Sequence, residues 1–295
     1  MHAIGGVRRL VDVRWATLAL VVLATVGLGL TGGGGVDADE GPSTPAQEDA
    51  LSKPLPPCPP VPGPYDGRDP PHPYQPGDPI CSAEGTGVFR ADVRLSRDAG
   101  ALALMQKNVG VWTWDPGLAG LAVSRSVSNP SLGSDDTQYH TMHAGRSGKW
   151  IEIGWAKRGS GTPELFVASH TGYWSYTSEY PISPGQTINV QIDNYPHNNS
   201  WRAELWWNGT WRVLKTIDIG TIIAEDANVI AEMFTQDSNW PTLPTTWIYD
   251  TQLLQCLTDC RWKKWDTSIG TTAWGDWPYH AHFTNYYYKW YAHRH

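Results

Sequence analysis

From Gly87 onward the chain consists of short runs that alternate apolar and polar residues and are separated by glycine, proline and asparagine. Alternation with a period of two is typical of strands that bury one face. Only residues 99–106 hint at a helix. Many short strands with turn residues between them indicate an all-β domain, and we expect an antiparallel β-sandwich of the jelly-roll or concanavalin-like kind.

The expected strands fall on most of the apolar runs between residues 88 and 234. They are residues 88–95, 121–127, 149–157, 163–169, 172–177, 186–193, 202–207, 210–217 and 228–234. Asn208-Gly209 separates two of them and is the strongest hairpin signal in the chain, because a tight two-residue turn needs positive φ at both positions.

The chain divides into three segments by composition. Residues 1–38 read as a signal peptide, because arginines precede an apolar stretch and small residues precede Ala38. The apolar stretch, residues 15–31, equally fits an uncleaved N-terminal anchor. Residues 39–80 form a Pro-rich linker, and residues 81–295 a single β-sandwich domain with an aromatic C-terminal segment. We expect a secreted or extracytoplasmic protein, with the N-terminal segment as a tether to a membrane or cell wall.

Charge and cysteine content restrict the partners and the compartment. The formal net charge is −7 and no long basic run occurs, which excludes a nucleic-acid partner. Four cysteines suit an oxidising compartment. They allow three pairings, of which we favour the two local ones, Cys58–Cys81 and Cys256–Cys260.

Two glutamates lie inside apolar runs. In residues 149–155, alternation places Ile151, Ile153 and Trp155 on one face and Trp150, Glu152 and Gly154 on the other. A glycine in a strand lets a ligand or another backbone come close.

The second glutamate is Glu232, which alternation places on one face with Ile230 and Phe234. A carboxylate on an apolar face has a raised pKa. The alternative is that each glutamate lies on the solvated face of an outer strand, as most acidic residues do.

The segment Glu152–Trp155 resembles the Glu-x-Gly-Trp motif of the neprosin family of glutamic peptidases, and Glu232–Phe234 lies where the second catalytic glutamate of that family is expected. Ala231-Glu232 is also similar to the Ala-Glu-aromatic-Ile strand of the related fungal glutamic peptidases. The resemblance covers about residues 120–255. It departs from neprosins at Ala231, where they have glycine, and in the Pro-rich linker that stands in place of their activation domain.

The resemblance implies a secreted endopeptidase in which Glu152 and Glu232 are catalytic on the concave face of a sandwich, and in which no metal or cofactor is needed. Trp150, Gly154, Trp201 and Trp206 would then line the peptide site. Two neighbouring carboxyls that share one proton are expected to work best below pH about 5.

The chain also suggests a function without catalysis. Seventeen tryptophans and thirteen tyrosines against four phenylalanines suit flat binding surfaces. The alternative is therefore a carbohydrate- or cell-wall-binding sandwich with a polysaccharide partner. Its candidate residues are Trp201, Trp206, Trp207, Trp211 and the aromatic cluster at 274–291.

Two groups of histidines remain. His280 and His282, with His293 and His295, have a pattern that can bind a metal, but we favour a terminal strand or an aromatic surface segment there and expect no metal site. Asp135-Asp136 with His140 and His143 lie in a stretch rich in serine and glycine, which we interpret as a solvated loop. The histidines of that loop are given no role.

Overall fold

The structure is a computed structural model. It describes residues 54–61, 63–68, 72–75, 77–84, 90–91, 105–172, 174–194, 199–221, 223–236, 239–256 and 260–295. All of them belong to one compact unit, Asp49–His295. The described residues form strands, turns and loops, with no helix among them and therefore none that could span a membrane. The proposed signal or anchor lies outside the described residues.

Sixteen strands make up the described fold. They are β1 (Ile80–Ser82), β2 (Arg90–Ala91), β3 (Met105–Ser126), β4 (Thr137–Arg146), β5 (Lys149–Arg158), β6 (Glu164–Ser169), β7 (Trp174–Thr177), β8 (Thr187–Asp193), β9 (Ser200–Trp207), β10 (Thr210–Asp218), β11 (Ala224–Thr235), β12 (Thr246–Gln255), β13 (Arg261–Lys264), β14 (Thr271–Gly275), β15 (Tyr279–Asn285) and β16 (Lys289–Arg294).

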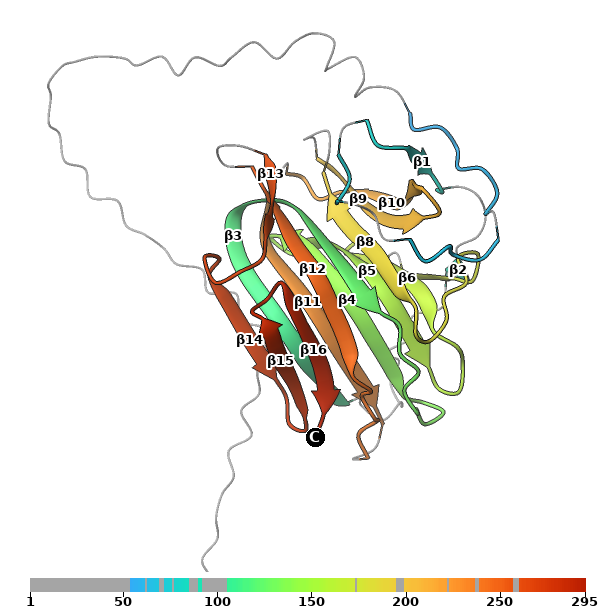
Figure 1. The fold of residues 1–295 in the computed structure, drawn as a ribbon, viewed down its shortest axis with the longest axis vertical. Coiled ribbons are helices and arrows are strands. Elements are labelled where there is room, and N and C mark those ends of the chain that lie inside the picture. The colour runs from blue at the N-terminus through green and yellow to red at the C-terminus, as the bar shows by residue number, and fades with distance from the viewer. Residues whose placement is uncertain are drawn as a thin grey trace, which may run out of the picture. The chain divides into compact units, whose positions relative to one another are not determined.

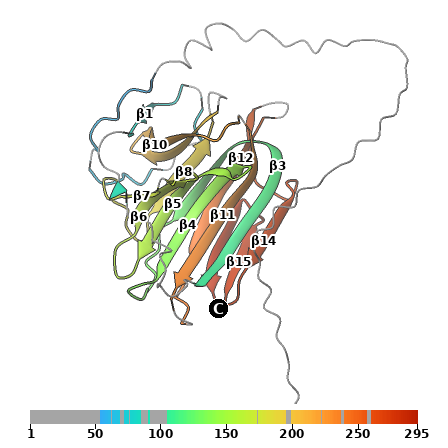
Figure 2. The same cartoon turned by 180° about the vertical axis from the view of Figure 1, so that it is seen from behind.

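The long strand β3 connects two sheets. Its first half pairs with β14 and β11, and its second half pairs with β8 and β12. The first sheet, which we call the glutamate sheet, has the order β14-β3-β11-β4-β5-β6-β7-β2. The second sheet has the order β1-β10-β9-β8-β3-β12-β16-β15, with β13 beside β12. Figures 1 and 2 show these strands from opposite sides.

The main core lies between the two sheets. Strand alternation directs Ile153 and Trp155 of β5 and Val229 of β11 into it, and from the second sheet Val190 and Leu205. Each sheet therefore has an outer face that points away from the core. On the glutamate sheet that outer face carries a smaller apolar cluster. Its members are Tyr139, Ala156, Phe166, Ala168 and Tyr176.

Several sequence predictions are confirmed. The described residues are all-β, in the sandwich-like arrangement of two sheets, and both expected disulfides are present, Cys58–Cys81 and Cys256–Cys260. Asn208 and Gly209 form the two-residue turn, with φ of 48° and 87°, between the paired residues Trp207 and Thr210. The finer jelly-roll assignment stays a prediction.

Other predictions are wrong. The stretch around His140 and His143 is not a loop but strand β4, in the centre of the glutamate sheet. The expected strand 121–127 is only the end of the 22-residue strand β3. Of the helix expected over 99–106, residues 105–106 begin β3 and the rest lie outside the described residues.

Part of the Pro-rich segment packs against the second sheet. β1 pairs in parallel with β10, and Tyr65 lies 5.2 Å from the ring of Trp207. Tyr74 is buried, and its backbone N–H donates to Gln191 at 2.8 Å. These contacts lie within residues that we expected to serve as a linker, so the boundary at residue 81 stays a proposal.

The Cys58–Cys81 disulfide should stabilise this packing. It closes a loop with a sequence separation of 23, whereas Cys256–Cys260 has a separation of 4. Because longer closed loops restrict the unfolded chain more, replacing Cys58 and Cys81 by serine should lower the free energy of unfolding by about 2–4 kcal/mol. Urea denaturation measures this, and the Cys256→Ser/Cys260→Ser pair, which should cost less, is the matched control.

Candidate active site

The two candidate glutamates lie on one face of the glutamate sheet. Glu152 is paired across to His143 of β4, and Glu232 is paired across to Tyr139 of the same strand. Directly paired residues share a sheet face, so the outer face carries all four side chains. Thr141 lies between Tyr139 and His143 on this face, so the glutamates flank the middle of β4. The face assignments made from alternation in β5 and β11 are therefore correct.

Glu152 is buried, with 8% of its surface exposed. Burial raises its pKa above the ordinary value for glutamate, because the low-polarity surroundings penalise the ionised form. The Thr141 hydroxyl and the positive charge of Arg125 offset part of this shift. Both Thr141 and Arg125 therefore favour the ionised form of Glu152.

Glu232 is half-buried, and its Oε1 accepts a hydrogen bond of 2.9 Å from Gln106 Nε2 on β3. Burial raises its pKa, and the charge on Glu152 raises it further. Two carboxyls that repel each other are not easily ionised together. The charge on one carboxyl therefore favours the protonated form of the other.

The structure adds residues that the sequence analysis missed. His143 is directly opposite Glu152, and burial lowers the pKa of its imidazole to about 4, so it is neutral near pH 7. Asn228 Nδ2 lies 3.4 Å from His143 Nδ1, and Asp226 Oδ2 lies 3.9 Å from the same nitrogen. The sequence analysis could not place His143 beside Glu152, because the polar sequence of β4 shows no alternation and was interpreted as a loop.

Gly154 has a different role from the one predicted for it. A Cβ at this position would lie 2.7 Å from Thr141 Cα and would also contact the carbonyl oxygen of His140. The glycine therefore admits the backbone of β4, which is the second of the two reasons for a strand glycine considered above. We withdraw it from the residues that would bind substrate.

Aromatic side chains border the pair on the same face. Trp150 of β5 is half-buried, 5.7 Å from the ring of His143. The pairing of β3 with β11 and β14 also places Trp112, Trp114 and Trp274 on this face, and Trp114 is 58% exposed. The face thus presents apolar rings on both sides of the carboxyls, which suits an extended ligand with apolar side chains.

Trp201 and Trp206 do not belong to this site. Both are on β9 of the second sheet, where alternation turns Trp201 into the core with no exposed surface. Trp206 lies on the outer face of that sheet, and its Nε1 donates to the Arg68 carbonyl at 3.1 Å. Trp207 and Trp211, considered for sugar binding, are buried as well.

The histidines near the C-terminus lie on β15 and β16, as the prediction of a terminal strand required. His280 is 4.2 Å from His295 and 6.1 Å from His293 between ring centroids. Within the described residues, no group of three histidine, cysteine or acidic side chains is arranged to hold a metal ion.

Comparisons with known proteins give only structural neighbours. No family model matches the chain, and no curated protein matches it. Two solved structures of scytalido-glutamic peptidase are similar in fold: one with a transition state analog inhibitor (TM-score 0.46, 14% identity) and one with a peptide-based transition state analog (TM-score 0.42, 13% identity). SCP-B, of the Eqolisin family of peptidases, in complex with the tripeptide Ala-Ile-His, has a TM-score of 0.41 and 14% identity.

Each of these alignments covers 65% of this chain and 100% of the other chain. These three neighbours are scytalido-glutamic peptidase and a member of the Eqolisin family, so the finer neprosin assignment stays a prediction. At these TM-scores the likeness carries no argument about activity, which has to rest on the site itself.

Proposed function

We propose that this protein is a glutamic-type endopeptidase in which Glu152 and Glu232 activate water for attack on a peptide bond. The observation that carries the proposal is the pair itself: two glutamates on one face of the sheet, on the two strands that flank β4, both with raised pKa and one raised by the charge of the other. Pairs of carboxyls whose pKa values are pushed apart are suited to act as base and acid.

The surroundings assign a role to each carboxyl. Ionised Glu152 accepts a proton from the attacking water, while protonated Glu232 donates a hydrogen bond to the carbonyl oxygen of the substrate. As the carbon–nitrogen bond breaks, the proton of Glu232 passes to the leaving nitrogen, and the proton that Glu152 took from water leaves the pair singly protonated again. Gln106 holds Glu232 from β3, and Trp150, Trp112 and Trp274 border the substrate. The chemistry uses side chains of the chain alone.

Export fits this proposal. Two disulfides are stable in an oxidising compartment, and we propose that residues 1–38 direct the chain out of the cytoplasm. A protein retained by residues 15–31 and one that is released after cleavage would both expose the sheets to extracellular peptides.

The proposal is tested by incubating the purified protein, expressed from Asp39 onward, with unfolded casein at pH 3 to 10. Release of peptides is expected, and it should persist with a metal chelator, because no step needs a metal. A folded protein, verified by circular dichroism, that releases no peptide from casein or from reduced and alkylated lysozyme over this range would overturn the proposal.

A further inference from the structure

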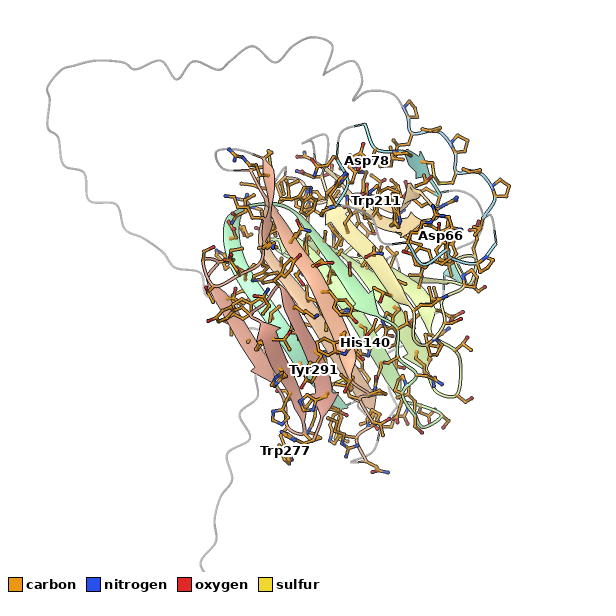
Figure 3. The ribbon with its side chains drawn as sticks, in the orientation of Figure 1. Asp66, Asp78, His140, Trp211, Trp277 and Tyr291 are labelled. Atoms are coloured by element: carbon orange, nitrogen blue, oxygen red, sulfur yellow. A yellow bond between two sulfur atoms is a disulfide. The ribbon has the colours of Figure 1, made fainter. Side chains whose placement is uncertain are left out.

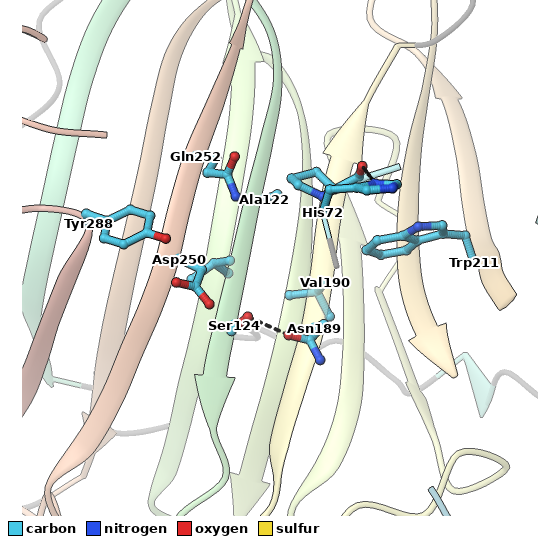
Figure 4. Close-up of a pocket in the computed structure, with 11 residues that line it drawn as sticks. His72, Ala122, Ser124, Asn189, Val190, Trp211, Asp250, Gln252 and Tyr288 are labelled. Atoms are coloured by element: carbon cyan, nitrogen blue, oxygen red, sulfur yellow. Dashed lines mark hydrogen bonds between the residues drawn. The ribbon is translucent and has the colours of Figure 1, made fainter. Parts of the chain in front are cut away.

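A polar pocket lies on the outer face of the second sheet, and the core of the sandwich separates it from the glutamate pair (Figure 4). Its volume is about 150 Å³. Pockets for drug-sized ligands run from about 300 to 1,000 Å³, so this one takes a single small ring. The side chains that matter are Ser124, Asn189, Trp211, Asp250, Gln252 and Tyr288.

The backbone of β12 is distorted at this pocket. Asp250 has a φ of 52°, in the left-handed region that a side chain with a Cβ rarely adopts. The register of β12 against β3 shifts between Tyr249 and Gln252. Bulges of this kind re-aim side chains and are enriched at functional sites. Here the bulge directs both Asp250 and Gln252 to the pocket, as Figure 4 shows.

The pocket offers hydrogen-bond donors and acceptors in nearly equal measure. The Ser124 hydroxyl donates to Asn189 Oδ1 at 2.5 Å, and Asp250 raises the pKa of the nearby Tyr288 hydroxyl. Within the described part of the chain, the side-chain amide of Gln252 has no hydrogen-bond partner. A hydroxyl-rich neutral ligand, whose groups both donate and accept, matches such a lining better than a single charged group does.

A row of aromatic rings continues from the pocket on the same sheet face. Tyr249 is paired across to Ser124, and its ring is nearly parallel to that of Trp247, 5.9 Å away. Tyr291 lies 4.7 Å from Trp247, and His282 lies 4.8 Å from Tyr291 at an angle of 29°. We call these four side chains the aromatic row.

The aromatic row is accessible. Trp247, Tyr249 and Tyr291 are half-buried and His282 is exposed, so part of their surface faces solvent. Figure 3 labels Tyr291, the member of the aromatic row that lies on β16.

We propose that this surface binds an extended oligosaccharide of β-1,4-linked hexopyranose units. A pyranose ring has an apolar face of C–H groups and an edge of hydroxyls. The first packs on aromatic rings, and the second bonds to amide, carboxylate and hydroxyl groups. One sugar ring occupies the pocket, and the following rings lie along the aromatic row. The site lies on the opposite face of the sandwich from Glu152 and Glu232, so it retains the protein on a polysaccharide without covering the proposed active site.

Isothermal titration calorimetry with cellohexaose and, separately, chitohexaose tests the proposal on the protein from Asp39 onward. Saturable binding of at least one of them is expected. Trp247→Ala and Tyr291→Ala should each weaken it by about tenfold, because each removes a stacking surface. Gln252→Ala leaves the aromatic row intact and should weaken binding severalfold through lost hydrogen bonds.

Trp114→Ala is the matched control, because it removes an exposed tryptophan from the glutamate sheet. It should bind either oligosaccharide like the wild type. Absence of saturable binding by the folded wild type, or equal weakening by Trp114→Ala and Trp247→Ala, would overturn the proposal. Casein hydrolysis, measured in parallel, should be unchanged by Trp247→Ala, so a failure of sugar binding and a failure of the peptidase proposal are distinguishable.

Discussion

Glu152→Gln should lose peptide hydrolysis by about 10²–10⁴-fold in kcat while it keeps the wild-type fold. The amide has nearly the shape of the carboxyl but cannot take a proton from water. Glu232→Gln should lose a similar factor, because its amide cannot deliver a proton to the leaving nitrogen. Initial rates of casein hydrolysis at saturating substrate, with circular dichroism of each variant, measure both effects.

The two losses should not multiply. Because either substitution disables the pair, the double variant should be about as inactive as each single one. Glu164→Gln is the matched control. Glu164 lies on β6 of the same sheet and is engaged by Arg158 at 3.3 Å. Its variant should stay within about twofold of the wild type. Wild-type turnover in either Glu152→Gln or Glu232→Gln would remove that residue from the proposed mechanism.

Local alternation was enough to predict the faces of the strands that carry the glutamates. In β5 and β11 the residues on either side of each glutamate are apolar and point into the core, so the period of two is visible in the sequence. The hairpin at Asn208-Gly209 was equally local, because its positive φ values follow from the two residues themselves.

Strand β4 could not be predicted in this way, because its polar residues are satisfied only by the tertiary structure. His140 is buried against the ring of Trp155, 4.0 Å away and nearly parallel. Gln138 is also buried and donates to the Thr242 carbonyl. Both partners are distant in the sequence or on another strand. With β4 taken for a loop, His143 could not be placed opposite Glu152.

The binding roles predicted for two of the tryptophans were wrong for a different reason. Trp201 and Trp207 were candidates for binding because tryptophan is often half-exposed, but both fill the space between two sheets and have no exposed surface. The alternation of β9 separates Trp201, Ala203, Leu205 and Trp207 from Arg202, Glu204 and Trp206. The period of two therefore already indicated that Trp201 and Trp207 share an inward, apolar face. Among the aromatic residues that border the glutamates, Trp150 lies on a predicted strand, whereas Trp112, Trp114 and Trp274 lie on strand segments that were not predicted.

The pH dependence of activity should differ from that of an unburied carboxyl pair. Ordinary glutamate has a pKa near 4.3, from which the sequence alone suggested an optimum below pH about 5. Burial raises the pKa of both Glu152 and Glu232, and the charge of Glu152 raises that of Glu232 further. The state with one proton on the pair is therefore populated at higher pH, and activity at pH 7 should exceed activity at pH 4 by at least about tenfold.

The neighbouring titratable groups have only a limited effect on the pH range in which the pair carries one proton. Burial lowers the pKa of His143 to about 4 and raises that of Tyr139, so both are neutral near pH 7. Burial raises the pKa of Asp226 to about 6, so its ionisation affects the acidic side of the profile. Asp226→Asn separates this contribution, because it should change the shape below pH about 6 and leave the alkaline limb. An optimum below pH 5 in both proteins would contradict the expected profile.

Protein stability gives an independent measure of the same shifts. A carboxyl whose pKa is raised by folding binds its proton more tightly in the folded state, so it stabilises the fold at low pH, and this stabilisation is lost as the pH rises from about 4.3 to the raised folded value. Glutamine has no such proton. At pH 8, Glu152→Gln and Glu232→Gln should therefore each have a free energy of unfolding about 1–2 kcal/mol above that of the wild type, and so a higher melting temperature. At pH 4 the variants should show no such gain. Equal thermal stability of wild type and variants at both pH values would show that the carboxyls are not buried together in the folded protein.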